Sequence, residues 1–479
     1  MPAAEPGTVP GGVRRIAAVS AARLSGLVSR AFRRGGGTAL PGLVALRVDP
    51  SIVRGLASQL PSGSIVISGT NGKTTTSRIL GTILTTAGLP PLRNDAGSNL
   101  MRGLASSLVQ QSGPHGRLST ERYRIGLFEV DEAALPEALL NLDPRCVVLL
   151  DLFRDQLDRY GEVATVARIW TAAIERLDTE NTVIANADDP LVVDVASHAR
   201  TAPVYFGIED ADHTLSAPEH ARDVKTCPCC GGTITYNRTF LGHLGHYNCP
   251  ACGFARPEPS VRATHVAQQG TSGTTFRLIT PDGSADARLA LPGLYNVYNA
   301  VAAVAAAAAV GVDLATTVGA LANVTPAFGR MERFQIANRH VLLALAKNPT
   351  GLNEVLRTLV AADEPLHLLV MLNDNIADGR DVSWIWDADI ELLIDHVASA
   401  VFSGIRAEDM ALRFKYAGIV DRPGTPPWEI VHDTAAALDR ALALTPPGTT
   451  LAIVPTYTAL LDIYGVLVQR GFAKEYWEI

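Results

Sequence analysis

The sequence predicts an α/β protein with two sheet-containing domains. The first is a P-loop nucleotide-binding domain with a zinc-ribbon insertion, and the second is Rossmann-like. Three observations predict this fold class: a strand, a glycine loop and a helix follow one another over residues 64–87, apolar strands alternate with helical patterns along most of the chain, and five of the six cysteines lie between Cys227 and Cys252. We expect the divisions 1–50 (tail, basic helix and linker), 51–328, with the ribbon at 224–258, and 329–479.

Composition and charge exclude several classes of protein. Hydrophobic residues make up 47% of the 479 residues and charged residues 19%, as is typical of a globular protein with a substantial core. The net charge of -7 gives no support to a nucleic-acid partner. No run reaches the ~18 uncharged apolar residues of a membrane span, and the start lacks the apolar core of a signal peptide. We therefore expect a cytoplasmic protein.

The N-terminal region mixes apolar and basic residues. Residues 1–12 are rich in Pro, Gly and Ala and are predicted to be disordered. Val13–Arg34 has the pattern of a basic amphipathic helix, which can lie on the inner face of an anionic membrane. A packing helix with solvated arginines is the alternative. Gly35–Pro50 is predicted to be a linker because glycine and proline punctuate it, and Val53–Leu60 a short helix.

The first predicted strand, Ser64–Ile67, and the helical pattern of Thr75–Ala87 enclose a glycine loop. This arrangement points backbone N–H groups and the positive end of a helix at one place, which suits a polyanion. Lys73 would contact the β- and γ-phosphates, and the Thr74 hydroxyl would bind Mg²⁺. The loop fits a shortened P-loop, and a plain glycine turn is the alternative. The candidate nucleotide-binding residues are Gly69, Thr70, Asn71, Gly72, Lys73, Thr74 and Thr75.

Polar residues follow further strands of the first domain. The strand Arg124–Val130 leads into an acidic segment that begins with Glu129, and such carboxylates can hold Mg²⁺ or position water. An acidic helix N-terminus is the alternative. Cys146–Leu150 has the pattern of a buried strand, so its cysteine is expected in the core. After Thr182–Ala185 comes the turn Asn186-Ala187-Asp188-Asp189-Pro190, which begins a helix.

The cysteine cluster has the spacing of a zinc ribbon. Two C-x₂-C pairs are separated by eighteen residues, and each pair can place two thiolates on one ion. Four thiolates close a tetrahedral site, so the Zn²⁺ is predicted to be structural. Other ligand sets stay open, with one cysteine replaced by Cys229, His243 or His246. The four predicted ligands are Cys227, Cys230, Cys249 and Cys252.

An alanine-rich helix and a basic segment end the first domain. The helical pattern of residues 291–310 begins with Asn296 and Asn299 near one face, where they can cap the helix or reach a nucleotide base. Phe328–Arg333 interrupts the pattern and is predicted to be an interdomain hinge. Arg330 at such a hinge can close on a phosphate tail, and a surface salt bridge is the alternative.

Strands and helices alternate again from Val341 to the C-terminus. Two polar loops follow strands of this second domain: residues 346–351, which include Lys347, and residues 373–381, which end at Asp381. Polar loops at the carboxyl ends of strands favour a binding site. No Ser-His-Asp order or Cys-His pair stands out in the chain.

These motifs resemble the Mur ligases, the ATP-dependent amide-forming enzymes of peptidoglycan synthesis. The motifs in question are Gly69–Thr75, Asn186–Pro190, Gly293 with Asn296 and Asn299, and Gly329-Arg330. With the cysteine insertion, Lys347-Asn348-Pro349 and Asp374–Asp381, the pattern from about residue 40 onward is similar to the MurT family, the synthetase subunits of lipid II isoglutaminyl synthases.

The resemblance implies a Mur ligase-type fold and a ligase that uses ATP, Mg²⁺ and a structural Zn²⁺. ATP would phosphorylate the D-glutamate α-carboxylate of lipid II, and ammonia from a GatD-type glutaminase subunit would convert the acyl phosphate to D-isoglutamine. Asp381 would complete the partner's glutaminase triad, or else cap a helix at residues 383–385. The other implied residues are Lys347 and Glu129 for catalysis, Thr74 and Glu129 for Mg²⁺, and Asn186, Asp188, Asn296 and Arg330 for the nucleotide.

Three departures from ordinary Mur ligases sharpen these expectations. About 60 residues precede the phosphate loop, too few for a domain that binds a UDP-linked substrate, so a lipid-linked substrate is expected. Gln156 replaces the histidine that those ligases associate with a second Mg²⁺, and no lysine occurs between Tyr160 and Leu177, where they carry a carbamylated lysine. The alternatives are a stand-alone Mur- or folylpolyglutamate-type amino-acid ligase and a non-catalytic nucleotide-binding scaffold.

Overall fold

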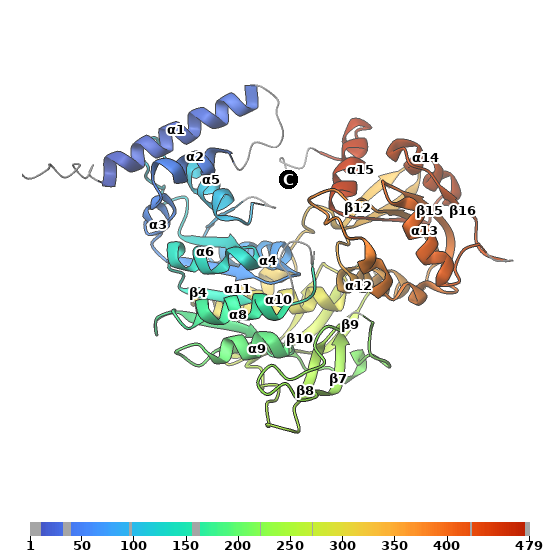
Figure 1. The fold of residues 1–479 in the computed structure, drawn as a ribbon, viewed down its shortest axis with the longest axis horizontal. Helices are drawn as coiled ribbons and strands as arrows, with labels where there is room; N and C mark the ends of the chain where they lie inside the picture. The colour runs from blue at the N-terminus through green and yellow to red at the C-terminus, as the bar shows by residue number, and fades with distance from the viewer. Residues whose placement is uncertain are drawn as a thin grey trace, which may run out of the picture.

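A computed structural model describes residues 11–31, 40–94, 98–155, 163–220, 222–270, 272–421 and 424–474. Gln156, the segment up to Tyr160 and most of the predicted N-terminal tail lie outside these described residues. Two large sheets, each with its own helices, lie side by side (Figure 1). Within the described ranges, none of the helices combines the length and apolarity that crossing a membrane requires.

The first sheet has nine strands in the order β11-β10-β9-β6-β5-β4-β1-β3-β2. The seven strands β9, β6, β5, β4, β1, β3 and β2 run parallel, and β10 and β11 add an antiparallel edge that the strand and helix pattern did not predict. The strands are β1 Ser64–Ser68, β2 Pro91–Arg93, β3 Ile125–Glu129, β4 Cys146–Leu149, β5 Thr182–Asn186, β6 Val204–Ile208, β9 Val261–Gln268, β10 Thr274–Thr280 and β11 Gly283–Leu289.

Helices cover both faces of this sheet. Ile65 and Ile67 of β1 contribute to the core beneath α4, α10 and α11, whereas Val66 contributes to the core on the other face. The helices are α3 Ile52–Ala57, α4 Lys73–Thr86, α5 Met101–Gln111, α6 Leu135–Leu142, α8 Val163–Ile174, α9 Pro190–Ser197, α10 Leu294–Ala309 and α11 Leu314–Leu321, with short 3₁₀ turns η1 Glu132–Ala134 and η2 Ala211–His213.

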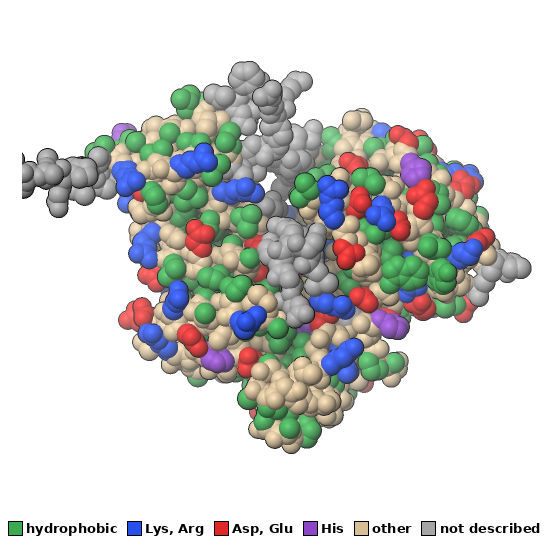
Figure 2. Space-filling view, viewed as in Figure 1, with side chains coloured by type: hydrophobic (Ala, Val, Ile, Leu, Met, Phe, Trp, Pro, Cys, Tyr) green, Lys and Arg blue, Asp and Glu red, His purple; other side chains and the backbone are tan. Residues whose placement is uncertain are grey.

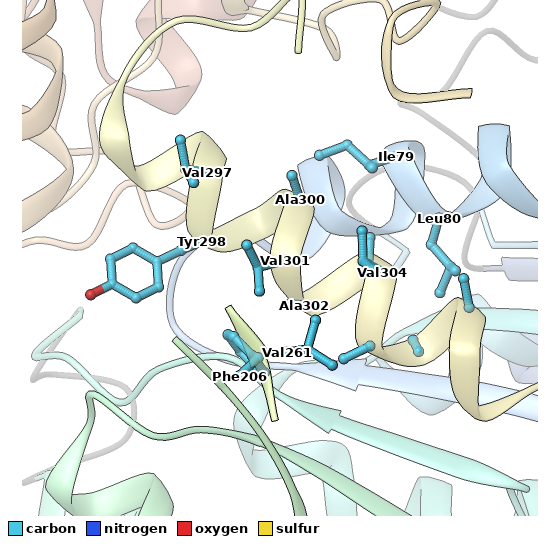
Figure 3. Packing of buried hydrophobic residues seen from close by; sticks show 14 of the residues in the cluster. Ile79, Leu80, Phe206, Val261, Val297, Tyr298, Ala300, Val301, Ala302 and Val304 are labelled. Carbon is cyan, nitrogen blue, oxygen red and sulfur yellow. The ribbon is translucent and has the colours of Figure 1, made fainter. Parts of the chain in front are cut away.

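The alanines of α10 bring this helix close to α4. Figure 3 shows Ala300 and Val304 of α10 beside Ile79 and Leu80 of α4, all of them buried. Small side chains let two helix backbones approach each other, and the contact extends to the helix N-termini, where Asn299 accepts a hydrogen bond from the Thr76 hydroxyl at 3.2 Å. This packing places the start of α10 next to the glycine loop.

The predicted linker over residues 35–50 is wrong for residues 40–48. They form α2 (Leu40–Val48), which packs between α1 (Gly11–Ala31) and α5. Pro41 stands at the second position of α2, where its missing N–H costs nothing. A Cβ on Gly42 would overlap the Arg102 carbonyl of α5. Glycine therefore serves close helix packing here, not chain reversal.

The second sheet has six strands in the order β12-β13-β17-β14-β15-β16, parallel except for β12. Its elements are β12 Arg330–Ile336, β13 Arg339–Ala344, α12 Pro349–Val360, β14 Leu366–Met371, η3 Ser383–Asp387, η4 Ile390–Leu393, β15 Val397–Ser403, α13 Ala407–Tyr416, β16 Trp428–Ile430, α14 Thr434–Leu444, β17 Thr450–Pro455 and α15 Tyr457–Gln469. The predicted strand and helix order of this half is confirmed. The segment predicted to be a hinge, residues 328–333, is only partly a connection between elements, because residues 330–333 begin β12. We propose a domain boundary at residue 328, between α11 and β12.

Candidate active site

The glycine loop between β1 and α4 is held against the end of β4. The Thr70 N–H donates to the Asp151 carbonyl (3.0 Å), and the Asn71 N–H donates to the Asp151 carboxylate (2.8 Å). Gly72, at the N-cap of α4, has a φ of +79°, and a Cβ there would overlap Oδ1 of Asn299. Among the described residues no side chain caps α4. Its first N–H groups are therefore placed to bind an anion.

Lys73 lies among carboxylates at the foot of this loop. Its ammonium donates to Glu132 at 3.1 Å and to two carbonyls of the loop. Burial lowers the pKa of Lys73, but the charges of Glu132 and Asp131 outweigh burial and raise the pKa above its usual value. Lys73 therefore stays charged at neutral pH, as contact with terminal phosphates requires.

Thr74 and Glu129 form the pair predicted to bind Mg²⁺. The Thr74 hydroxyl donates to the Glu129 carboxylate at 2.8 Å, and Glu129 is buried at the end of β3. The Asn94 side chain fixes Glu129 by accepting from its backbone N–H (2.9 Å) and donating to its carbonyl (3.0 Å). A hydroxyl and a carboxylate oxygen are donors that suit Mg²⁺ beside phosphates, so the residues fit this ion.

Two residues of the loop between β13 and α12 reach across to the first domain. The Lys347 ammonium donates to the Asp155 carboxylate, and the Asn348 amide donates to Oδ1 of Asn71 at 3.0 Å. Asn348 also accepts from the Gly351 N–H at 2.7 Å and so caps α12. The predicted catalytic Lys347 therefore lies near the phosphate loop, although about 270 residues separate them in the chain.

A cavity of about 790 Å³ opens between the two sheets beside the glycine loop. Predicted residues Asn186 and Arg330 line it, as do Asn71 and Gly72. Burial lowers the pKa of Arg330. On the side of the second sheet, Glu354 of α12 lines the cavity. The sequence did not predict this residue, because a helical pattern does not show which residue faces another domain.

Glu354 is a buried carboxyl whose Oε1 has no hydrogen-bond partner among the described residues. Nη1 of Arg357 lies 3.7 Å from it. Burial raises the pKa of Glu354 to about 8, and the charge of Arg357 opposes this rise only in part. The carboxyl is therefore mostly protonated at neutral pH and can both donate and accept a hydrogen bond.

Two residues predicted to bind the nucleotide form the wall behind the cavity and do not line it. The Asn296 amide donates to the Pro292 carbonyl at 2.6 Å, and its Oδ1 accepts from Asn299 at 3.2 Å. The fully buried Asp188 carboxylate accepts from the Tyr298 hydroxyl at 2.6 Å and pairs with Arg256. Asn296 and Asp188 therefore hold α10 in place. Of the two asparagines at the start of α10, Asn299 lines the cavity and Asn296 does not.

Asp381 lies in the exposed loop after β14. Its Oδ1 accepts from the Ser383 N–H at 2.8 Å, and hydrogen bonds from Ser383 lower the pKa of Asp381. The contact resembles the predicted helix cap, since Ser383 begins η3. Asp381 also lines a hollow of about 570 Å³ together with Lys347 and Asp155. The loop after β14 and the phosphate-loop region therefore share one surface.

The four predicted cysteine ligands meet at one point, at the base of the hairpin formed by β7 (Thr235–Leu241) and β8 (Leu244–Asn248). Their sulfur atoms all lie within 4.8 Å of one another, with 3.7 Å between Cys227 and Cys252 and 3.6 Å between Cys230 and Cys249. A tetrahedral site with Zn–S bonds of about 2.3 Å has sulfurs about 3.8 Å apart. The cluster can therefore hold a metal ion of this kind.

The alternative ligands lie elsewhere. His243 is fully buried, with its Nε2 3.3 Å from Asp189 and its ring against Phe153. His246 directs its Nε2 to the Ile208 carbonyl at 3.0 Å. Cys229 is exposed and outside the cluster. Ligand sets that use these three residues are therefore wrong for the geometry described.

Comparisons with known proteins agree with the motifs. Residues 67–255 match the Mur ligase middle domain, and residues 345–460 match the MurT ligase C-terminal family. Over 449 residues the chain is 33% identical to the lipid II isoglutaminyl synthase (glutamine-hydrolyzing) subunit MurT of Staphylococcus aureus strain COL, covering 94% of this chain and 96% of that one. The chain belongs to the MurT family. The MurT subunit of Streptococcus pneumoniae strain R6 is 32% identical and matches over 92% of this chain and 95% of its own length.

Membership of the MurT family makes this chain a Mur ligase-type enzyme and confirms the predicted family and fold. Among solved structures, MurF from Acinetobacter baumannii superposes with a TM-score of 0.63 at 20% identity, over 88% of this chain and 80% of that one. This likeness concerns the fold alone. The MurT-type motifs around Lys347 and Asp381 lie within the matched C-terminal segment.

Proposed function

We propose that this MurT-family chain is the C–N bond-forming subunit of a lipid II isoglutaminyl synthase. It would use ATP to amidate the D-glutamate α-carboxylate of lipid II to D-isoglutamine, with ammonia from a GatD-type glutaminase subunit. The names of the Staphylococcus aureus and Streptococcus pneumoniae relatives support the substrate class and the use of glutamine. One observation carries the proposal: in the loop after β13, Lys347 pairs with Asp155 of the first domain, and its neighbour Asn348 contacts Asn71 of the phosphate loop.

The residues of this site suit activation of a carboxylate. ATP would supply the phosphoryl group, and Thr74 and Glu129 would hold a Mg²⁺ whose charge offsets that of the phosphates. Lys73 and the first N–H groups of α4 hold the terminal phosphates. Lys347 would orient the substrate carboxylate as it becomes an acyl phosphate. Ammonia then attacks the acyl carbon, the C–O bond to phosphate breaks, and amide and inorganic phosphate form.

The hollow between Asp381 and Lys347 supports delivery of ammonia from a second subunit. Asp381 stands at its exposed edge, where it can accept a hydrogen bond from a partner histidine. Lys347 and Asp155 line the same hollow on the phosphate-loop side. A glutaminase docked over the Asp381 loop would therefore release ammonia towards the acyl phosphate. The lipid-linked substrate also implies work at the inner face of the cytoplasmic membrane.

Replacing Asp381 with asparagine is expected to lower glutamine-dependent amidation by about 100-fold or more, because the partner's histidine loses its orienting charge. Amidation driven by added ammonium chloride should stay within about twofold of wild type, since no synthetase group is altered. Mass spectrometry of lipid II after reaction with either nitrogen source measures both. Asp374→Asn, in the same loop and paired with Arg406 at 3.2 Å, is the matched control. Equal loss with both nitrogen sources would contradict the assignment.

We propose that the 790 Å³ cavity receives the base and ribose of the nucleotide. Replacing Glu354 with alanine should then raise the KM for ATP about tenfold, because a buried hydrogen-bonding group is lost. Glu354→Gln keeps a donor and an acceptor and should change KM by less than about threefold. The ATP dependence of amidation measures both, with exposed Glu364→Ala as control. An unchanged KM in Glu354→Ala would place the nucleotide elsewhere.

We also propose that the four clustered cysteines hold a structural Zn²⁺. Four sulfurs at mutual distances near those of a tetrahedral thiolate site leave no open position for substrate. The ion would join the two ends of the β7–β8 hairpin, whose Leu241 and Leu244 line the nucleotide cavity. Its role would then be to stabilise one wall of that cavity.

A further inference from the structure

Helix α1 turns its larger apolar side chains away from the protein. Its inward face is made of small or short residues, Ala18, Val19, Ala22 and Gly26, all buried. At 100° per residue, its exposed apolar residues fall within an arc of about 80° on the opposite face. We call these four residues the apolar stripe: Val13 (57% exposed), Ile16 (38%), Leu24 (64%) and Leu27 (59%).

The neighbouring helix α2 has the same character. Leu40 and Leu43 are 42% and 36% exposed, and Pro41 packs against Gly26 of α1. Both helices lie at one end of the molecule, beyond the first sheet and away from the second (Figure 1). Figure 2 shows hydrophobic and basic side chains over this end. Exposed apolar residues grouped in this way indicate a surface that binds a membrane or another protein.

The charge around the apolar stripe has one sign. Residues 11–48 contain seven arginines and no Asp or Glu, although the whole chain has a net charge of -7. Arg14 is exposed beside the stripe, where its Nε donates to the Val48 carbonyl at 2.8 Å, and Arg47 is exposed on α2. Arg23, on the other side of the stripe, donates to the Ser112 carbonyl. Backbone contacts therefore hold two cations beside the apolar residues.

We propose that α1 docks this chain on an anionic phospholipid bilayer, with the apolar stripe in the headgroup region and the arginines on the lipid phosphates. A helix that only packs against its own protein needs no leucine on its outer face. A protein partner would need a surface both apolar and acidic in matching places. An anionic bilayer offers apolar depth and negative charge without a shaped fit, so charge and hydrophobicity together favour it.

Co-sedimentation of the full chain with vesicles tests this directly. Binding to vesicles of phosphatidylglycerol and phosphatidylcholine should be at least about tenfold stronger than to phosphatidylcholine alone, and should weaken as salt rises. The Leu24→Glu/Leu27→Glu variant should bind anionic vesicles at least about tenfold more weakly than wild type. Leu140→Glu changes a leucine of α6 that is also half exposed (50%), and this control should bind as wild type.

Leu24→Trp covers the case in which the double variant does not fold. Brominated lipids should quench its added tryptophan beyond the wild-type signal, whereas Leu140→Trp should show no excess quenching. Lack of wild-type binding, or equal binding by the double variant, would overturn the proposal. So would a wild-type dimer that the double variant splits into monomers without lipid, because the stripe would then be a protein interface. Vesicle binding needs neither substrate nor glutaminase, so it succeeds or fails independently of the proposed reaction.

Discussion

Replacing Lys73 with alanine is expected to reduce ATP-dependent amidation at least about 1,000-fold, the largest loss expected from any single substitution in this chain. The Lys73 side chain is only 11% exposed, and its ammonium keeps its charge because Glu132 and Asp131 lie beside it. In the proposed reaction the Lys73 ammonium contacts the terminal phosphates. Its loss therefore removes stabilisation of their negative charge, which water cannot replace where access to solvent is small. Amidation with saturating ammonium chloride isolates this effect from the glutaminase.

Stability has to be separated from chemistry in this experiment. Lys73→Ala leaves the Glu132 carboxylate buried without its partner at 3.1 Å, and such a charge destabilises a fold. The double variant Lys73→Ala/Glu132→Gln removes that charge and should recover thermal stability without recovering turnover. Lys415→Ala, a surface lysine paired with Asp421, should leave both unchanged. A Lys73→Ala protein that keeps its turnover would favour the non-catalytic scaffold.

Local patterns in the sequence predicted the phosphate loop and four of the nine strands of the first sheet, β1, β3, β4 and β5. The run Ser64–Ile67, the glycines after it and the helix from Lys73 are contiguous, so their geometry depends on neighbours in the chain. The cysteine site was also predictable, because each C-x₂-C turn sets the spacing of two sulfurs by itself. The linker prediction failed at Pro41 and Gly42 because the role of both residues depends on helix packing.

Contacts between the two sheets lay beyond sequence reasoning. Lys347 and Asp155 are 192 residues apart, and Asn348 and Asn71 are 277 apart, so no periodic pattern connects them. Glu354 faces the cavity only because α12 stands against the first domain. The motif around Asp188 likewise suggested a nucleotide contact. It could not show that the Asp188 carboxylate already accepts a hydrogen bond from Tyr298 and pairs with Arg256, because both partners are distant in the chain.

Replacing Cys227 with serine is expected to lower the melting temperature by about 5 °C or more, because a closed thiolate site contributes folding free energy on the order of 10 kcal/mol. Cys227 is buried, and its N–H donates to the Gly232 carbonyl within the first cysteine turn. Without the ion, the β7–β8 hairpin loses the link between its ends. Metal content and calorimetric unfolding of the purified chain measure the change, and exposed Cys229→Ser should leave both unaltered.

Turnover per folded molecule separates a structural ion from a catalytic one in the Cys227→Ser variant. The hairpin contributes Leu241 and Leu244 to the cavity, and its Gly245 N–H donates to the Asp188 carbonyl at 2.9 Å. Loosening it should therefore raise the KM for ATP a few-fold while kcat with ammonia stays near wild type below the unfolding transition. Unchanged stability together with a lost kcat would indicate that the ion is catalytic and not structural. The thiolate cluster would then have to open to substrate during the reaction.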